Sequence, residues 1–132
     1  MGAHPYQYLV DYQADAQAAL SDLRQATFHS GAYYGAHKRA RTPEEALELS
    51  DETGTRSILD ITRVTQRPAC GCAAPFTQQE LESYFGTPTP TVAMVEECDA
   101  LWEDLERGQA RYLAIYDNGV PRQIMFVGYS FD

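Results

Sequence analysis

The chain has 132 residues, of which 44% are hydrophobic and 22% are charged, and these values predict one globular domain. Nineteen acidic and ten basic side chains give a formal net charge of −9, which disfavours binding to nucleic acid or to an anionic membrane surface. The sequence contains no apolar stretch of membrane-spanning length and no signal-peptide pattern, so we expect a cytoplasmic protein. The bias toward Ala and Arg is typical of GC-rich coding DNA and favours a bacterial source.

The first third of the sequence predicts a strand, a helix and a loop. Over residues 6–12, every second residue (Tyr6, Tyr8, Val10 and Tyr12) is aromatic or β-branched, which is the period of a half-buried strand. Residues 15–28 repeat apolar positions at helical spacing, and Gly31 follows as a helix terminator. Residues 32–41 show no clear period, so we expect a long loop or an additional edge segment there.

Two helix starts are marked by the same capping pattern, in which a Thr is followed three residues later by a Glu. The first is Thr42-Pro43-Glu44-Glu45, and its helix is predicted to end at Gly54. The second is Thr77-Gln78-Gln79-Glu80, which begins a short helix ending at Gly86.

Three further segments can be assigned between and after these helices. β-branched residues are frequent over 56–65, which predicts a strand. Residues 66–76 contain two Pro and a Gly and are predicted to be a loop. Residues 92–107 are predicted to form the longest helix of the chain, ended by Gly108.

The last 23 residues predict a β-hairpin, because Asn118-Gly119 is a strong type I′ turn signal between residues 110–116 and 120–131. In this register Tyr116 faces Pro121, and the adjoining end of the last strand has no outer neighbour. Residues 1–132 are therefore expected to form a single α+β domain. The predicted elements follow one another along the chain in the order β-α-α-β-α-α-β-β. The four strands would form one mainly antiparallel sheet. We also expect that the chain can form a homodimer through an edge strand, with the last strand as the candidate.

The predicted helix over residues 92–107 has an apolar arc and an acidic opposite face. Like charges three and four residues apart destabilise a helix, and acids near its C-terminus oppose the helix dipole. Such a face can simply be solvated, or it can dock onto a basic protein. The candidate partner-binding residues are Glu96, Glu97, Asp99, Glu103, Asp104 and Glu106.

One basic and aromatic segment lies within the predicted loop. Aromatic and basic side chains together can hold a base or a phosphate, so this segment is the candidate site for a small anionic ligand. The alternative is a mobile loop whose cations pair with acids of the same chain. The candidate residues are Tyr33, Tyr34, His37, Lys38, Arg39 and Arg41.

Asp60 interrupts the apolar pattern of the predicted strand over residues 56–65. A carboxylate buried in a central strand has to be paired or functional. We favour a structural ion pair, with Arg56, Arg63 or Arg111 as the partner, over a catalytic acid.

The sequence contains no recognised catalytic motif and no set of residues with metal-ligand spacing. Cys70 and Cys72 are two residues apart, whereas zinc sites usually have cysteines three to five residues apart. We therefore expect no metal and no cofactor. His29 and His37 are general-base candidates by residue type only.

Two hypotheses of function follow from these patterns. The favoured one is a non-enzymatic protein-binding module, for example an immunity or antitoxin-like inhibitor that covers the basic cleft of an enzyme. The alternative is a small-molecule-binding or catalytic domain with a Tyr-lined pocket between sheet and helices. In that case residues 29–41 would form a lid, and Asp60 or His37 would act as the acid or base.

Overall fold

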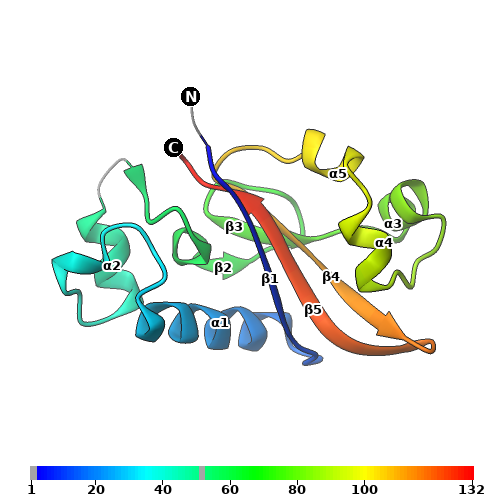
Figure 1. Ribbon diagram of the computed structural model, residues 1–132, viewed down its shortest axis with the longest axis horizontal. Coiled ribbons are helices and arrows are strands. Elements are labelled where there is room, and N and C mark those ends of the chain that lie inside the picture. Colours follow the sequence, from blue (N-terminus) through cyan, green and yellow to red (C-terminus); the bar gives the residue numbers. More distant parts are fainter. Residues whose placement is uncertain (1–2, 51–52) are drawn as a thin grey trace.

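The sheet at the centre of the computed structural model, which describes residues 3–50 and 53–132, has five strands in the order β1-β5-β4-β3-β2 (Figure 1). β5 pairs antiparallel with both β1 and β4, while β3 pairs parallel with β4 and with β2. Four strands therefore point in one direction, and only β5 runs against them. The strands are β1 (Pro5–Asp11), β2 (Arg63–Val64), β3 (Cys72–Pro75), β4 (Ala110–Asp117) and β5 (Val120–Tyr129).

Helices flank this sheet, with α1 and α2 at one side and the three short helices α3 to α5 grouped at another (Figure 1). The α-helices are α1 (Ala16–Ser30), α2 (Pro43–Leu49), α3 (Gln78–Phe85), α4 (Val92–Glu96) and α5 (Ala100–Glu103). Two short 3₁₀ helices, at Ala36–Lys38 and Ile58–Asp60, complete the described elements. None of the helices in the described ranges is long and apolar enough to span a membrane.

The alternation of side chains along the strands divides the core into two clusters, one on each face of the sheet. On β5, Ile124 and Phe126 pack in a cluster with Leu20 and Leu23 of α1. Their neighbours Met125 and Val127 belong to the second cluster, which includes Val95 of α4, Leu101 of α5 and side chains of α3. The protein is thus a single α+β domain whose sheet is covered on both faces.

The predicted helix ends are largely confirmed. Asp15 caps α1 by accepting hydrogen bonds from the backbone N–H groups of Gln17 and Ala18. Thr77 and Glu80 form the full reciprocal capping box of α3. Thr42 caps α2, but this helix ends at Leu49, and the predicted continuation toward Gly54 crosses residues 51–52, which lie outside the described residues.

The C-terminal hairpin is also confirmed. Asn118 and Gly119 have φ angles of 52° and 76°, as a type I′ turn requires. Tyr116 lies opposite Pro121, and a register shift follows between Ile115 and Tyr116. β1 does not reach this end of β5. However, β5 lies between β1 and β4 over most of its length, so the last strand is not an edge strand, contrary to the expectation for a dimer.

The prediction of a four-stranded, mainly antiparallel sheet is wrong in strand number and direction. The missed strand is β3, which lies in the segment 66–76 that was predicted to be a loop. Its residues Cys72, Ala73 and Ala74 are all buried, so the strand has no alternation of apolar and polar residues. A run this short gives no periodic signal.

The predicted strand over residues 56–65 is mostly a 3₁₀ turn, and only Arg63–Val64 is extended as β2. The Ser57 hydroxyl accepts a hydrogen bond from the Leu59 N–H, which caps the turn. Asp60 accepts two hydrogen bonds from Thr55 and closes the preceding loop. Such local bonds from side chains to the backbone compete with strand pairing, and here they outweigh the β-propensity of the segment.

The predicted helix over residues 92–107 is divided into α4 and α5. α4 ends with Glu97 as its C-cap, and Asp99 begins α5 without capping it through its side chain. Four acidic residues at spacings of three and four would have repelled each other along a continuous helix. This repulsion is a physical reason for the break. Met94 of α4 is 43% exposed.

Candidate functional site

The six candidate partner-binding acids lie on α4, on α5 and in the segments that follow each helix, and all six are exposed. We call them the acidic surface. Among the described residues, no ion pair includes any of these carboxylates, although Asp104 accepts a hydrogen bond from the Tyr84 hydroxyl. Because the helix is broken, these acids do not form one helix face, but they remain together within eleven consecutive residues.

A hollow of about 410 Å³ adjoins this surface. Glu97 and Asp99 contribute acidic groups to it, whereas Phe85 and Met94 contribute apolar ones. Tyr84, Cys98 and Ala100 complete its lining. The hollow therefore combines carboxylates with apolar walls, which suits a side chain with an aliphatic stem and a cationic end.

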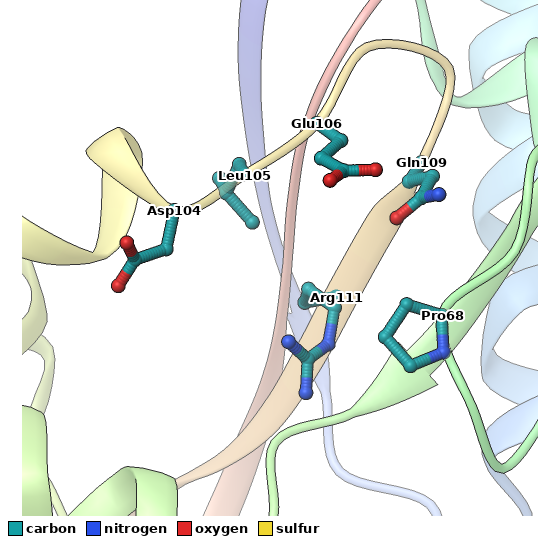
Figure 2. Close-up of a pocket in the computed structure, with 6 residues that line it drawn as sticks. All are labelled: Pro68, Asp104, Leu105, Glu106, Gln109 and Arg111. Atoms are coloured by element: carbon teal, nitrogen blue, oxygen red, sulfur yellow. The ribbon is translucent and has the colours of Figure 1, made fainter.

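A second hollow, of about 210 Å³, is lined by Asp104, Leu105 and Glu106 from the segment after α5, together with Pro68, Gln109 and Arg111 (Figure 2). Arg111 is already bound, because its guanidinium contacts both carboxylate oxygens of Glu80 at 2.6 and 3.2 Å. It also donates to the carbonyl oxygens of Ala74 and Pro75. This arginine therefore joins α3 and β4 to β3 and is not a free anion-binding group.

Three side chains of the basic and aromatic segment make contacts within the domain. The Lys38 ammonium donates to the Leu49 carbonyl oxygen at 2.7 Å, at the end of α2. Tyr34 lies under the Arg56 guanidinium, 4.2 Å from ring centroid to Cζ, and Tyr33 stacks on Phe28. These contacts attach the segment to the domain. The remaining candidates, His37, Arg39 and Arg41, are exposed.

Asp60 is 2% exposed, but its partner differs from the prediction. The carboxylate oxygen Oδ1 accepts hydrogen bonds from the Thr55 N–H at 2.6 Å and from the Thr55 hydroxyl at 2.8 Å. The predicted ion pair is wrong: among the described residues, Arg56 pairs with Asp132, Arg111 pairs with Glu80, and no ion pair includes Asp60 or Arg63. The Asp60 side chain thus stabilises the turn through its two hydrogen bonds with Thr55.

The environment of Asp60 raises the pKa of its carboxyl group. Burial is the largest cause, and the hydrogen bonds from Thr55 oppose it. The second oxygen, Oδ2, has no hydrogen-bond partner among the described residues. A Cβ atom at Gly54 would lie 2.8 Å from this oxygen, and the φ angle of Gly54 is +69°, so both space and backbone conformation require glycine there.

A third hollow, of about 660 Å³, lies elsewhere. It is found at the carboxyl ends of β2 and β3, beside the start of α1. Gln17, Thr65, Gln66 and Tyr112 give it polar groups. Ligands of α/β proteins often bind at the carboxyl ends of parallel strands. Neither Asp60 nor His37 lines this hollow, so the predicted Tyr-lined site with an acid or base is not assembled there.

Sequence reasoning missed the walls of these hollows. Phe85 and Met94 come from different helices, and Gln17 meets Tyr112 only because α1 starts beside the strand ends. No sequence spacing connects such residues. Within the described ranges, no group of three or more His, Cys, Asp or Glu side chains could hold a metal ion, and the three cysteines are free thiols.

Comparison with known proteins adds no assignment. No protein-family model matches the chain, and searches of curated proteins and of solved structures find no significant match. Any proposal about function therefore has to be argued from the residues and their geometry.

Proposed function

We propose that this protein is a binding module that docks onto a basic protein through the acidic surface. The observation that carries the proposal is the set of six exposed carboxylates within residues 96–106, which no cation of the described chain pairs with. Exposed acids that repel each other cost stability, so they are not explained by folding. A basic partner would relieve this repulsion and gain attraction at the same time.

The hollow between α3 and α4 gives this surface a shape as well as a charge. An Arg or Lys of the partner could place its aliphatic stem against Phe85 and Met94 while its charged end meets Glu97 and Asp99. Apolar anchors surrounded by polar groups are the usual anatomy of a specific protein interface. The net charge of −9 would in addition steer a basic partner toward the protein.

A partner whose catalytic cleft is basic would be blocked by such a complex. This is the behaviour of an immunity or antitoxin-like inhibitor, and we propose that role as the specific form of the function. The small size of the domain agrees with it, because an inhibitor needs only one rigid surface.

The experiment is affinity capture from a bacterial lysate at low salt with the wild-type protein and with a variant of the acidic surface. The variant carries Glu96→Gln, Asp99→Asn, Glu103→Gln and Glu106→Gln. We expect the wild type to retain a basic protein that the variant does not retain and that high salt releases. Retention of the same proteins by both forms, or of no protein by either, would contradict the proposal.

One observation favours a second function, the binding of a small molecule in the hollow beside Gln17 and Tyr112. Its volume and its position at the strand ends are those of a ligand site. The test is a fragment screen observed by protein NMR. Chemical-shift changes confined to the start of α1, Val64 and Tyr112 would support this function, and their absence across the library would contradict it.

A further inference from the structure

β1 forms one edge of the sheet, and its backbone leaves a row of hydrogen-bonding groups directed away from the sheet. At its two ends, the Ser130 N–H donates to the His4 carbonyl oxygen and the Tyr12 N–H donates to that of Arg122. The even-numbered residues therefore bond to β5, because alternate residues of an antiparallel strand point in opposite directions. The N–H groups that point outward are those of Gln7, Leu9 and Asp11.

The side chains of the same residues are uncovered. Along β1, Tyr6 is buried and Tyr8 and Val10 are half-buried, on the face that packs with α1. On the other face, each odd-numbered residue of the strand is exposed, and Leu9 is 40% exposed. An apolar side chain in the middle of an unpaired edge is a feature that proteins usually avoid.

The opposite edge of the sheet shows how such an edge can be closed. β2 is only two residues long, and the Val64 N–H donates to the Gln17 side-chain oxygen at 2.9 Å. Among the described residues, no side chain accepts a hydrogen bond from an N–H group of β1 in this way. β1 also has seven residues in unbroken register with β5.

We propose that β1 is a dimer interface, at which the protein pairs antiparallel with the β1 strand of a second copy. With Leu9 opposite Leu9 of the second copy, Gln7 faces Asp11 on both sides of the two-fold axis. This register uses every outward N–H of the strand, joins two exposed leucines and places an amide beside each carboxylate. A register centred on Asp11 would oppose two carboxylates, and one centred on Gln7 would leave Asp11 unpaired. The edge is thus complementary to itself in one register.

The first test is the mass of the purified protein in solution, measured by light scattering and by sedimentation equilibrium over a range of concentrations. We expect twice the chain mass of 14.8 kDa for the wild type and 14.8 kDa for Leu9→Lys, which places two ammonium groups at the two-fold axis. Val120→Lys is the matched control, because Val120 is similarly exposed at the hairpin, and it should remain dimeric. A monomeric wild type, or a dimer that survives Leu9→Lys, overturns the proposal.

The second test examines the register by cross-linking, in a Cys70→Ser background that removes the exposed native thiol. Opposed residues in a bonded antiparallel pair have Cα atoms about 5.5 Å apart, which permits a disulfide. Leu9→Cys should therefore give a covalent dimer on mild oxidation, whereas Gln7→Cys should not. Equal cross-linking of the two variants, or none in either, overturns this register.

The dimer does not rest on the proposed docking function, and salt distinguishes the two. Salt screens the repulsion between two chains of charge −9, so the dimer should strengthen at high salt. Binding of a basic partner should weaken under the same conditions. A dimer that dissociates as salt increases would contradict strand pairing as its basis.

Discussion

The two faces of the sheet use their polar groups in different ways. On the face covered by α1, two buried charged side chains bind within the protein: Asp60 accepts hydrogen bonds from Thr55, and Arg24 donates to the Leu59 carbonyl oxygen and to Glu44. On the face covered by α3 to α5, six carboxylates are exposed and have no cationic partner among the described residues.

This contrast distinguishes buried charged side chains that stabilise the fold from exposed carboxylates that do not contribute to its stability. A buried carboxylate is stable only if its hydrogen bonds are made, so its loss should be costly. An exposed carboxylate among like charges contributes nothing to folding, so its loss should cost nothing. Substitutions of the two kinds of carboxylate test that division.

The largest effect is expected for Asp60→Ala. The substitution leaves the buried Thr55 N–H without an acceptor and creates a small cavity, so we expect a loss of ~2–4 kcal/mol in the free energy of unfolding. Asp60→Asn is the matched control, because its side-chain oxygen can still accept both bonds from Thr55. The measurement is urea unfolding monitored by circular dichroism. Equal losses for the two variants would contradict the role of Asp60 as an acceptor.

The same pair of proteins gives a prediction for pH. Burial raises the pKa of Asp60 above 3.8, so the folded state binds this proton more tightly than the unfolded chain. The resulting stabilisation is complete below pH 3.8 and is lost as the pH rises through the raised pKa of the folded state. The free energy of unfolding of the wild type should therefore fall relative to that of Asp60→Asn over this window. A difference in the free energy of unfolding between the two proteins that stays constant across this pH window would contradict the raised pKa of Asp60.

The next effect is expected for Glu80→Gln, at the contact between α3 and β4. Glu80 is partly exposed and binds Arg111 through both oxygens, so its neutralisation should cost roughly 1–2 kcal/mol at neutral pH. Burial acts to raise the pKa of Glu80, but hydrogen bonds from Arg111 and Thr77 outweigh it and hold the pKa below 4.5.

The stabilisation from Glu80 is therefore present above pH 4.5 and lost as the pH falls through the lowered pKa of the folded state. Denaturant unfolding of the wild type and of Glu80→Gln should converge in stability at acidic pH, where Glu80 is also neutral. Persistence of the full difference in acid would exclude the ion pair as its cause.

A smaller effect is expected for Tyr84→Phe. The Tyr84 hydroxyl donates to Asp104, and burial together with this carboxylate raises the pKa of Tyr84 to about 12. The bond joins α3 to the acidic surface near the protein exterior, so its loss should cost about 0.5–1 kcal/mol. Thermal unfolding of the two proteins measures it. A loss of stability as large as that caused by Asp60→Ala would contradict the proposed difference between the two faces of the sheet.

The smallest effect on stability is expected for the fourfold variant of the acidic surface. Of the four acids, only Asp99 and Glu103 keep helical spacing on one helix, at α5, and relief of the repulsion between such a pair is worth about 0.2–0.5 kcal/mol. The variant should therefore be as stable as the wild type or slightly more stable. Urea unfolding at low salt checks this prediction. A loss of stability would show that these carboxylates serve the fold.

The sequence predicts local structure well where side chains bind their own neighbours. The capping box of α3 and the turn at Asn118-Gly119 were predicted correctly because each depends on a few consecutive residues. β3 was not, because its position between β2 and β4 is decided by contacts from distant parts of the chain. The break between α4 and α5 could have been predicted from the sequence, because acidic residues spaced three and four apart disfavour a continuous helix.

The candidate site was predictable in its charges and not in its shape. The exposure of the acids is predictable because charged side chains are rarely buried, whether the helix is continuous or broken. The hollow beside Glu97 needs Phe85 and Met94 to meet, and that depends on how α4 turns after the break. The partner of Asp60 was missed for a related reason: a Thr five residues away became its donor once the predicted strand folded into a turn.

The most direct test of the docking function compares two fourfold variants of equal net charge. One carries Glu96→Gln, Asp99→Asn, Glu103→Gln and Glu106→Gln. The other carries Asp22→Asn, Glu48→Gln, Glu82→Gln and Asp117→Asn, which are exposed acids outside the acidic surface and outside β1. The measurement is the Kd of each variant for the purified basic protein that the wild type captures. We predict that the acidic-surface variant loses at least about tenfold in affinity, which corresponds to about 1.4 kcal/mol, while the second variant binds like the wild type. Equal losses in both would show that only net charge matters, and would contradict a defined docking surface.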